Sequence, residues 1–170
     1  MEGVRVAYTL EQCWHRVPGG TAVSAIEVAR AMPMVRADVE LLGVSGRHGE
    51  DSAVTFDISI DVAGLPISGP LLYEASLRLR QPRVERALSD IDLLHNTSII
   101  PFATKAKMVS TVHDLAFLHH PSYISWYQRA YYRWFTPAFL KKAKENNAKT
   151  KNGYDMLVFQ AEKAWKIWNE

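Results

Sequence analysis

Polar side chains that can bind ligands or move protons follow one apolar segment of the chain, residues 4–10, and lie toward the ends of two others, residues 91–100 and 107–117. They are, in chain order, Glu11, His15, His95, Asn96, His113 and Asp114. An imidazole in such a position can hydrogen-bond a sugar hydroxyl or stabilise a developing charge. A histidine that caps the next loop, or a plain polar loop, is the structural alternative.

A second candidate is the stretch "PGGTAVSA", in which Gly19, Gly20 and Thr21 open a helical pattern. Two residues without Cβ atoms let a ligand approach the backbone, and the N–H groups of a helix start favour an anion. A tight turn without a ligand is the alternative. The dinucleotide pattern G-x-G-x-x-G and the Walker loop are absent, so NAD binding is disfavoured.

Composition and residue spacing exclude several other classes of protein. The net charge of +2 is too small to indicate nucleic-acid binding. His119 and His120 have no cysteine or acid at ligand spacing, so we expect no metal and no cofactor. Cys13 is the only cysteine, so the chain cannot form an internal disulfide. The stretch "VRVAYTL" is too short for a leader peptide, and no apolar run is long enough to span a membrane. We therefore expect a cytoplasmic protein.

The elements that must position these residues alternate between strand and helix. Strands are predicted over 4–10, 38–46, part of 53–66, 91–100 and 107–117; helices are predicted over 22–32 (ended by Pro33), 69–88 (interrupted near Pro82), 122–135 and 136–146. Apolar strands that alternate with helices are typical of a buried parallel sheet. We therefore predict an α/β fold: a single Rossmann-like three-layer domain with a mainly parallel sheet, in an order near 3-2-1-4-5. Ligands of such sheets bind at the carboxyl ends of the strands.

Three stretches together are similar to a known family: "RVAYTLEQCWHRVPGGTAVSAIEVARAM", "LLHNTSIIPF" and "MVSTVHDLAFLHHPSYIS". They resemble the N-terminal half of family 4 glycosyltransferases, which are retaining, metal-independent enzymes of the GT-B fold. The resemblance covers residues 4 to about 135. In that family a C-terminal domain holds a nucleotide-sugar donor, while the N-terminal domain supplies the acceptor site and a glycine loop that touches the donor diphosphate.

The resemblance implies a role for each candidate residue. Gly19, Gly20 and Thr21 would bind the donor diphosphate; His113 and Asp114 would be catalytic; His95, Asn96, Glu11 and His15 would face the acceptor.

The chain is shorter than that family's full members, which run to more than twice its length. The expectation is therefore an acceptor-binding half whose donor-binding domain is missing and which is inactive alone. Its partners would be a nucleotide-sugar donor, an unknown acceptor and the missing C-terminal domain, with no nucleic acid. Glu162 and Glu170 have the family's E-x(7)-E spacing, which we interpret as coincidence. A non-catalytic Rossmann-like scaffold, or an engineered protein that keeps only the fold, is the rival hypothesis, so whether the chain is an enzyme stays open.

The last thirty residues differ in composition, because residues 1–140 hold every arginine and residues 141–170 hold most of the lysines. We predict a Rossmann-like N-terminal glycosyltransferase domain over 1–140 and, over 141–170, a Lys/Asn-rich link with a C-terminal helix. That tail is either a crossover helix or an engineered join, and a strand over 154–159 followed by a shorter helix is the alternative. The aromatic helix predicted over 122–135 could lie on a membrane surface, although a core position is favoured.

Overall fold

The computed structural model describes residues 3–15, 19–49, 57–98, 101–113, 144–145, 147–149, 158 and 162. The chain divides into two compact units, Met1–Asp114 and Leu115–Glu170. In the second unit, four of the described residues are helical: Lys144, Glu145, Val158 and Glu162. The predicted helix over 122–135 and most of the predicted tail lie outside the described residues, and the division at residue 140 stays a prediction.

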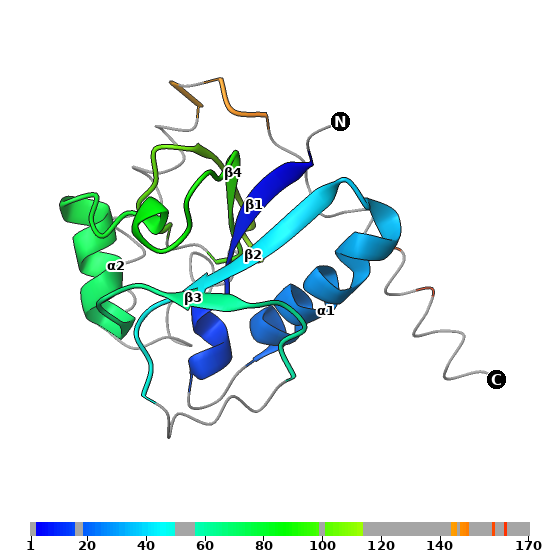
Figure 1. Cartoon of the computed structure of the whole chain (residues 1–170), viewed down its shortest axis with the longest axis horizontal. Coiled ribbons are helices and arrows are strands. Elements are labelled where there is room, and N and C mark those ends of the chain that lie inside the picture. The colour runs from blue at the N-terminus through cyan, green and yellow to red at the C-terminus, as the bar shows by residue number, and fades with distance from the viewer. Residues whose placement is uncertain are drawn as a thin grey trace. The chain divides into compact units, whose positions relative to one another are not determined.

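Five strands of the first unit form one parallel sheet in the order β3-β2-β1-β4-β5 (Figure 1). They are β1 (Val4–Thr9), β2 (Val39–Ser45), β3 (Val62–Gly64), β4 (Leu93–Asn96) and β5 (Lys107–Ser110). This confirms both the predicted strand order and the predicted parallel sheet. Strands β2 and β3 are added on one side of β1, whereas β4 and β5 are added on its other side. Strand β1 is therefore the central strand, and β4 lies next to it.

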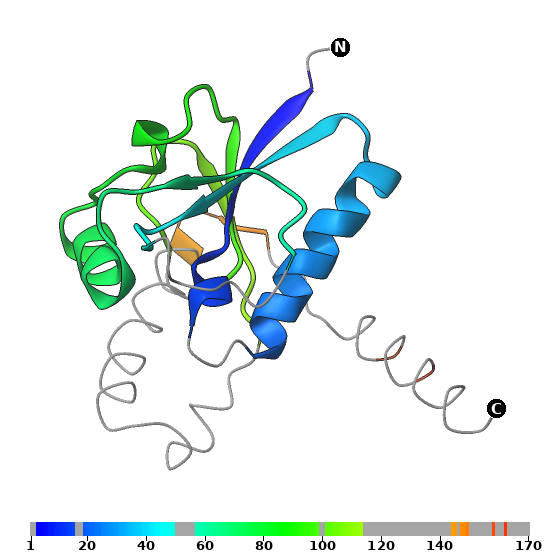
Figure 2. The same ribbon diagram turned by 60° about the horizontal axis from the view of Figure 1, so that its bottom comes forward.

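Two α-helices cover the sheet on opposite faces, which gives the three layers predicted (Figure 2). The helices are α1 (Gly20–Val35) and α2 (Gly69–Arg78), with the short 3-10 turns η1 (Glu11–Trp14) and η2 (Val84–Arg86). Successive strand residues point to opposite faces, so one strand serves two cores. In β1, Ala7 belongs to the core beneath α2 and Tyr8 to the core beneath α1.

The core beneath α1 combines large strand side chains with small helix side chains. It consists of Tyr8, Leu10, Cys13, Ala22, Ala25, Ile26 and Ala29. The alanines bring the helix backbone close enough for the buried Tyr8 hydroxyl to donate a hydrogen bond to the carbonyl of Ala25 (3.0 Å). The hydroxyl is thereby satisfied, as a buried polar group must be. This packing fixes α1, and therefore its N-terminus, against β1.

The core beneath α2 is built from aliphatic residues and one phenylalanine. It consists of Ala7, Val44, Leu65, Leu72, Val84, Leu94 and Phe102. Leu72 comes from α2 and Val84 from η2, and both are fully buried. Removing a buried leucine such as Leu94 would cost about 2–5 kcal/mol of folding free energy.

Several predicted boundaries differ from those observed. Pro33 lies inside α1 and does not end it. The proline removes only one backbone hydrogen bond of the helix, and the last turn is still closed by the bond from Arg36 N–H to the Met32 carbonyl (2.8 Å). The predicted helix over 69–88 is interrupted, as expected, although it already ends at Arg78, two residues before Arg80 adopts a positive φ of 52°.

The fifth strand also differs from its prediction. It ends at Ser110, and Met108 and Val109 are exposed rather than buried. Within the described sheet β5 pairs only with β4, so it is an edge strand. An apolar sequence run was therefore a poor guide to burial at this position.

Candidate active site

Nearly all the predicted site residues lie at one edge of the molecule. The parallel strands β1, β4 and β5 all end there, and α1 starts there after the loop that follows β1. The structure places at or just beyond this carboxyl edge Glu11, His15, Gly19, Gly20, Thr21, His95, Asn96 and His113. Asp114 lies outside the described residues.

The first turn of α1 is open to solvent. Gly19 is the N-cap residue, with an extended backbone (φ −95°, ψ −167°), and no side chain caps the helix. A Cβ atom built on Gly19 or Gly20 would meet nothing within 4 Å, and neither residue has a positive φ. Neither packing nor backbone strain within the described residues therefore requires glycine here. Ala22 N–H donates to the Gly19 carbonyl (3.0 Å), whereas the N–H groups of Gly20 and Thr21 have no partner among the described residues and can receive an anion.

Thr97 connects the end of β4 to the end of β1. Its backbone N–H donates to the Thr9 hydroxyl (2.9 Å), and its own hydroxyl accepts a bond from the Gln12 side chain (2.7 Å). All three residues are buried. This polar network holds the loop that begins at Thr97, after β4, against the end of β1.

His113 is attached to that loop by its ring. Its Nε2 lies 3.0 Å from the carbonyl oxygen of Thr97. A carbonyl can only accept, so Nε2 carries the proton, and in the neutral ring Nδ1 is left as an acceptor. His113 is exposed, so this nitrogen can serve a ligand hydroxyl.

His95 sits deeper and beside His113. Its Nε2 lies 2.9 Å from the Thr111 hydroxyl, and its ring meets the Tyr8 ring edge-on at 5.1 Å. Burial, and then the charge of nearby His113, lower the pKa of His95 below its ordinary value of 6.5. The ring is therefore neutral at physiological pH, and two imidazoles from neighbouring strand ends form one pair.

Asn96 and Ser110 occupy matching positions on β4 and β5. Asn96 is fully buried, and its Nδ2 donates to the carbonyl of Ser98. Asn96 Oδ1 and Ser110 Oγ are both buried without a hydrogen-bond partner in the described part of the chain. A buried polar group without a partner is costly, so this pair calls for a water or a ligand hydroxyl.

Glu11 has a different environment from the one its sequence position suggested. Its carboxylate is buried and accepts hydrogen bonds from Gly46 N–H (2.6 Å), Gly69 N–H (3.1 Å) and His48 Nε2 (3.0 Å). It thereby joins the end of β1 to the loop after β2 and to the start of α2. No described contact joins it to His95 or His113. Its proposed contact with an acceptor stays a prediction.

Three further residues at this edge were not predicted from the sequence: Thr97, Trp14 and His48. The Trp14 and His48 rings are stacked with centroids 4.6 Å apart and planes 6° from parallel, while His15 beside them is exposed. Thr97 lies inside the "HNTS" motif and could have been chosen from it. Nothing in the sequence pairs Trp14 with His48, because their contact depends on how the loops after β1 and β2 fold.

Several other chemistries find no support in the described residues. Within them, no group of three or more histidine, cysteine, aspartate or glutamate side chains could hold a metal ion. Burial raises the pKa of Cys13 to about 11, so this cysteine stays a thiol at neutral pH and is a poor nucleophile. None of the described helices is long and apolar enough to cross a membrane.

Comparison with known proteins gives one clear result. The family model described as Glycosyltransferase Family 4 matches residues 18–151. No curated protein and no solved structure matches the chain. The matched range covers most of the chain and contains α1, His95 and His113.

Proposed function

The chain belongs to glycosyltransferase family 4, and on this premise we propose that its carboxyl edge is the acceptor side of a sugar-transfer site that also touches the donor diphosphate. A nucleotide-sugar is the proposed donor, and transfer is proposed to retain the anomeric configuration. The observation that carries the proposal is that the open N-terminus of α1 and the His95–His113 pair share this edge. Sugar transfer needs both kinds of group, one for the leaving phosphate and one for hydroxyls.

The diphosphate would lie against Gly19, Gly20 and Thr21. Helix N–H groups and the helix dipole stabilise the negative charge that grows on a leaving nucleoside diphosphate. The absence of Cβ atoms on Gly19 and Gly20 lets phosphate oxygens reach these groups, and the space beside both residues is open. Such contacts gain strength as the sugar–phosphate bond breaks, which is when they lower the barrier.

The sugar and the acceptor would lie against the strand ends. Nδ1 of His113 can accept a hydrogen bond from a hydroxyl of the transferred sugar, since Nε2 is committed to Thr97. The neutral His95 and the Oδ1 of Asn96, which has no partner in the described part of the chain, offer further positions for acceptor hydroxyls. Asp114, beside His113, and His15 are proposed to complete this side. Their task is positioning, which supplies a large share of the rate of a two-substrate reaction.

The test is a titration with UDP- and GDP-sugars, followed by NMR at the amides of Gly19, Gly20 and Thr21. We expect these amides to shift, while the amide of Gly3, just before β1 at the amino edge of the sheet, serves as a reference that should not move. A variant with Gly19→Ala and Gly20→Ala should fold normally, because both Cβ atoms enter open space, yet lose most of the shift. Unchanged amides at saturating ligand would reject the proposal and favour a scaffold that keeps only the fold.

A further inference from the structure

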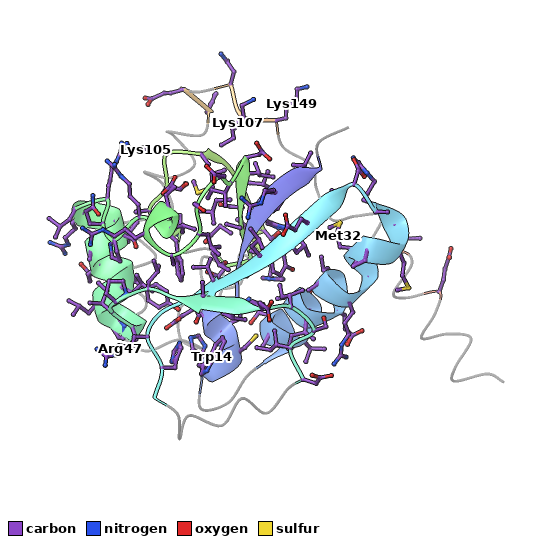
Figure 3. The ribbon with its side chains drawn as sticks, viewed as in Figure 1. Trp14, Met32, Arg47, Lys105, Lys107 and Lys149 are labelled. Atoms are coloured by element: carbon purple, nitrogen blue, oxygen red, sulfur yellow. The ribbon has the colours of Figure 1, made fainter. Side chains whose placement is uncertain are left out.

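A basic surface lies at the amino edge of the sheet, opposite the candidate site. We call it the basic edge, and it consists of Arg80, Arg83, Arg86, Lys105 and Lys107. Helix α2 starts at the carboxyl edge, where Gly69 N–H contacts Glu11, so its far end reaches the amino edge, where β5 also begins. Figure 3 shows Lys105 and Lys107 on one side of the first unit, with Arg47 and Trp14 on the other.

Two chain segments build this surface and are joined by backbone contacts. Arg83 pairs with Ala103 in an isolated parallel bridge. Glu85 of η2 accepts hydrogen bonds from Lys105 N–H (2.6 Å) and from the Thr104 hydroxyl (2.8 Å). The segment after α2 and the segment before β5 are therefore held side by side. Their five basic residues are therefore gathered at one edge of the sheet.

The cations of the basic edge lack counter-ions within the described part of the chain, where none of the five forms an ion pair. The neighbouring acids are already engaged. Glu74 pairs with Arg78 (2.6 Å), Glu85 accepts three hydrogen bonds through one oxygen, and Asp92 accepts the N–H of Arg5. The next acid along the chain is Asp90, which lies between η2 and β4. An excess of positive charge therefore remains.

Exposed large apolar side chains lie at the same amino edge. Leu79 at the C-cap of α2 is 71% exposed, and Met34 and Val35 at the end of α1 are 82% and 74% exposed. Large apolar side chains beside unpaired cations are typical of surfaces that bind anionic membranes. The cations attract the headgroups, and the apolar side chains enter the interfacial layer.

We propose that the basic edge, with the exposed apolar side chains of Leu79, Met34 and Val35, binds the surface of a bilayer that contains anionic lipid. An acidic protein would satisfy the cations alone, whereas anionic headgroups above an apolar layer satisfy both the cations and these apolar side chains. In this orientation the carboxyl edge faces away from the bilayer, so the sugar-transfer site stays open to the solvent. The proposal stands on the charge and exposure of these residues and does not depend on the proposed function.

The experiment is co-sedimentation of the chain with vesicles of equal parts phosphatidylglycerol and phosphatidylcholine, compared with phosphatidylcholine alone. We expect binding only to the anionic vesicles, and weaker binding as salt rises, because exposed charges are screened. A double variant, Arg80→Glu and Arg86→Glu, should lower the partition coefficient by about 25-fold or more, since each cation near such a surface contributes about fivefold. Leu79→Ser should weaken binding in a way that salt does not change.

Arg47→Glu is the matched control, because Arg47 is an exposed arginine at the opposite edge, and it should bind as the parent chain does. If the double variant fails to fold, Lys105→Gln with Lys107→Gln replaces it. Only the backbone of Lys105 contributes a hydrogen bond, so this second variant keeps the loop. Absence of binding to anionic vesicles, equal losses in the basic-edge and Arg47 variants, or binding to polyglutamate without binding to vesicles would each overturn the proposal.

Discussion

At the scale of single residues, Glu11 shows how a group chosen for chemistry also has a structural task. Its two carboxylate oxygens accept three hydrogen bonds, from Gly46, Gly69 and His48. We expect Glu11→Gln to lower the free energy of unfolding by about 1–3 kcal/mol, because the amide nitrogen would face a buried donor. Urea denaturation measures the loss. Glu27→Gln, which removes an exposed ion pair with Arg30, is the control and should change stability by less than about 1 kcal/mol.

His95 gives a prediction about pH. Because burial and the charge of His113 lower its pKa below 6.5, the unfolded chain binds more protons than the folded chain in the range between the two values. The stability that His95 contributes is therefore lost as the pH falls below about 6.5. An NMR titration of the His95 ring should give a pKa below that value, and His113→Gln should raise it part of the way back. A pKa at or above 6.5 in the parent chain would contradict this account.

At the scale of the elements, Glu85 holds together the loop that leads into β5. Burial acts to raise the pKa of Glu85. Hydrogen bonds from Lys105 N–H, the Thr104 hydroxyl and Ala106 N–H together lower it by more than burial raises it, so the pKa lies below its ordinary value of 4.5. The stabilisation is present above that value and is lost as the pH falls through the lowered one.

Substitution of Glu85 tests this loop. Glu85→Ala leaves Lys105 N–H and the Thr104 hydroxyl without an acceptor, while Ala106 N–H keeps the Thr104 hydroxyl oxygen (3.0 Å), and should cost about 1–3 kcal/mol at neutral pH. Glu85→Gln keeps an oxygen acceptor, so it should cost less and should reduce the loss of stability below pH 4.5. Thermal unfolding over a pH series measures both effects. Glu74→Gln, whose carboxylate pairs with the exposed Arg78, is the comparison and should stay within about 1 kcal/mol.

The order and direction of the strands could be predicted from the sequence, whereas several boundaries and exposures could not. Alternation of strands and helices permits few arrangements, and right-handed parallel connections select among them. The end of α1, by contrast, depends on a single hydrogen bond from Arg36, and the exposure of Val109 depends on β5 lying at the edge of the described sheet. Such features arise from neighbouring elements and leave little trace in a local pattern.

At the scale of the whole molecule, the same distinction applies to the candidate site. Residues that directly follow strands, such as His95 and His113, could be chosen from the sequence because parallel strands bring their carboxyl ends together. The three bonds to Glu11 and the stack of Trp14 on His48 join segments that are distant in sequence, and only the folded chain reveals them. Sequence reasoning therefore finds which residues reach the edge, and the structure finds what each one contacts there.

The final prediction concerns sugar transfer by the 170-residue chain. Transfer requires the leaving phosphate, the anomeric carbon and the acceptor hydroxyl to be held together. The described residues provide one helix N-terminus and one histidine pair for this purpose, which is one side of such an assembly. Incubation of the chain alone with radiolabelled UDP- or GDP-sugars and candidate acceptors should therefore give no product, and addition of a donor-binding domain should restore turnover. In the restored system His113→Ala should lower the rate about 10²-fold or more, as expected for a positioned group in the site, whereas Glu27→Gln on the outer face of α1 should not. Rapid transfer by the chain alone would show that the donor-binding residues lie within these 170 residues.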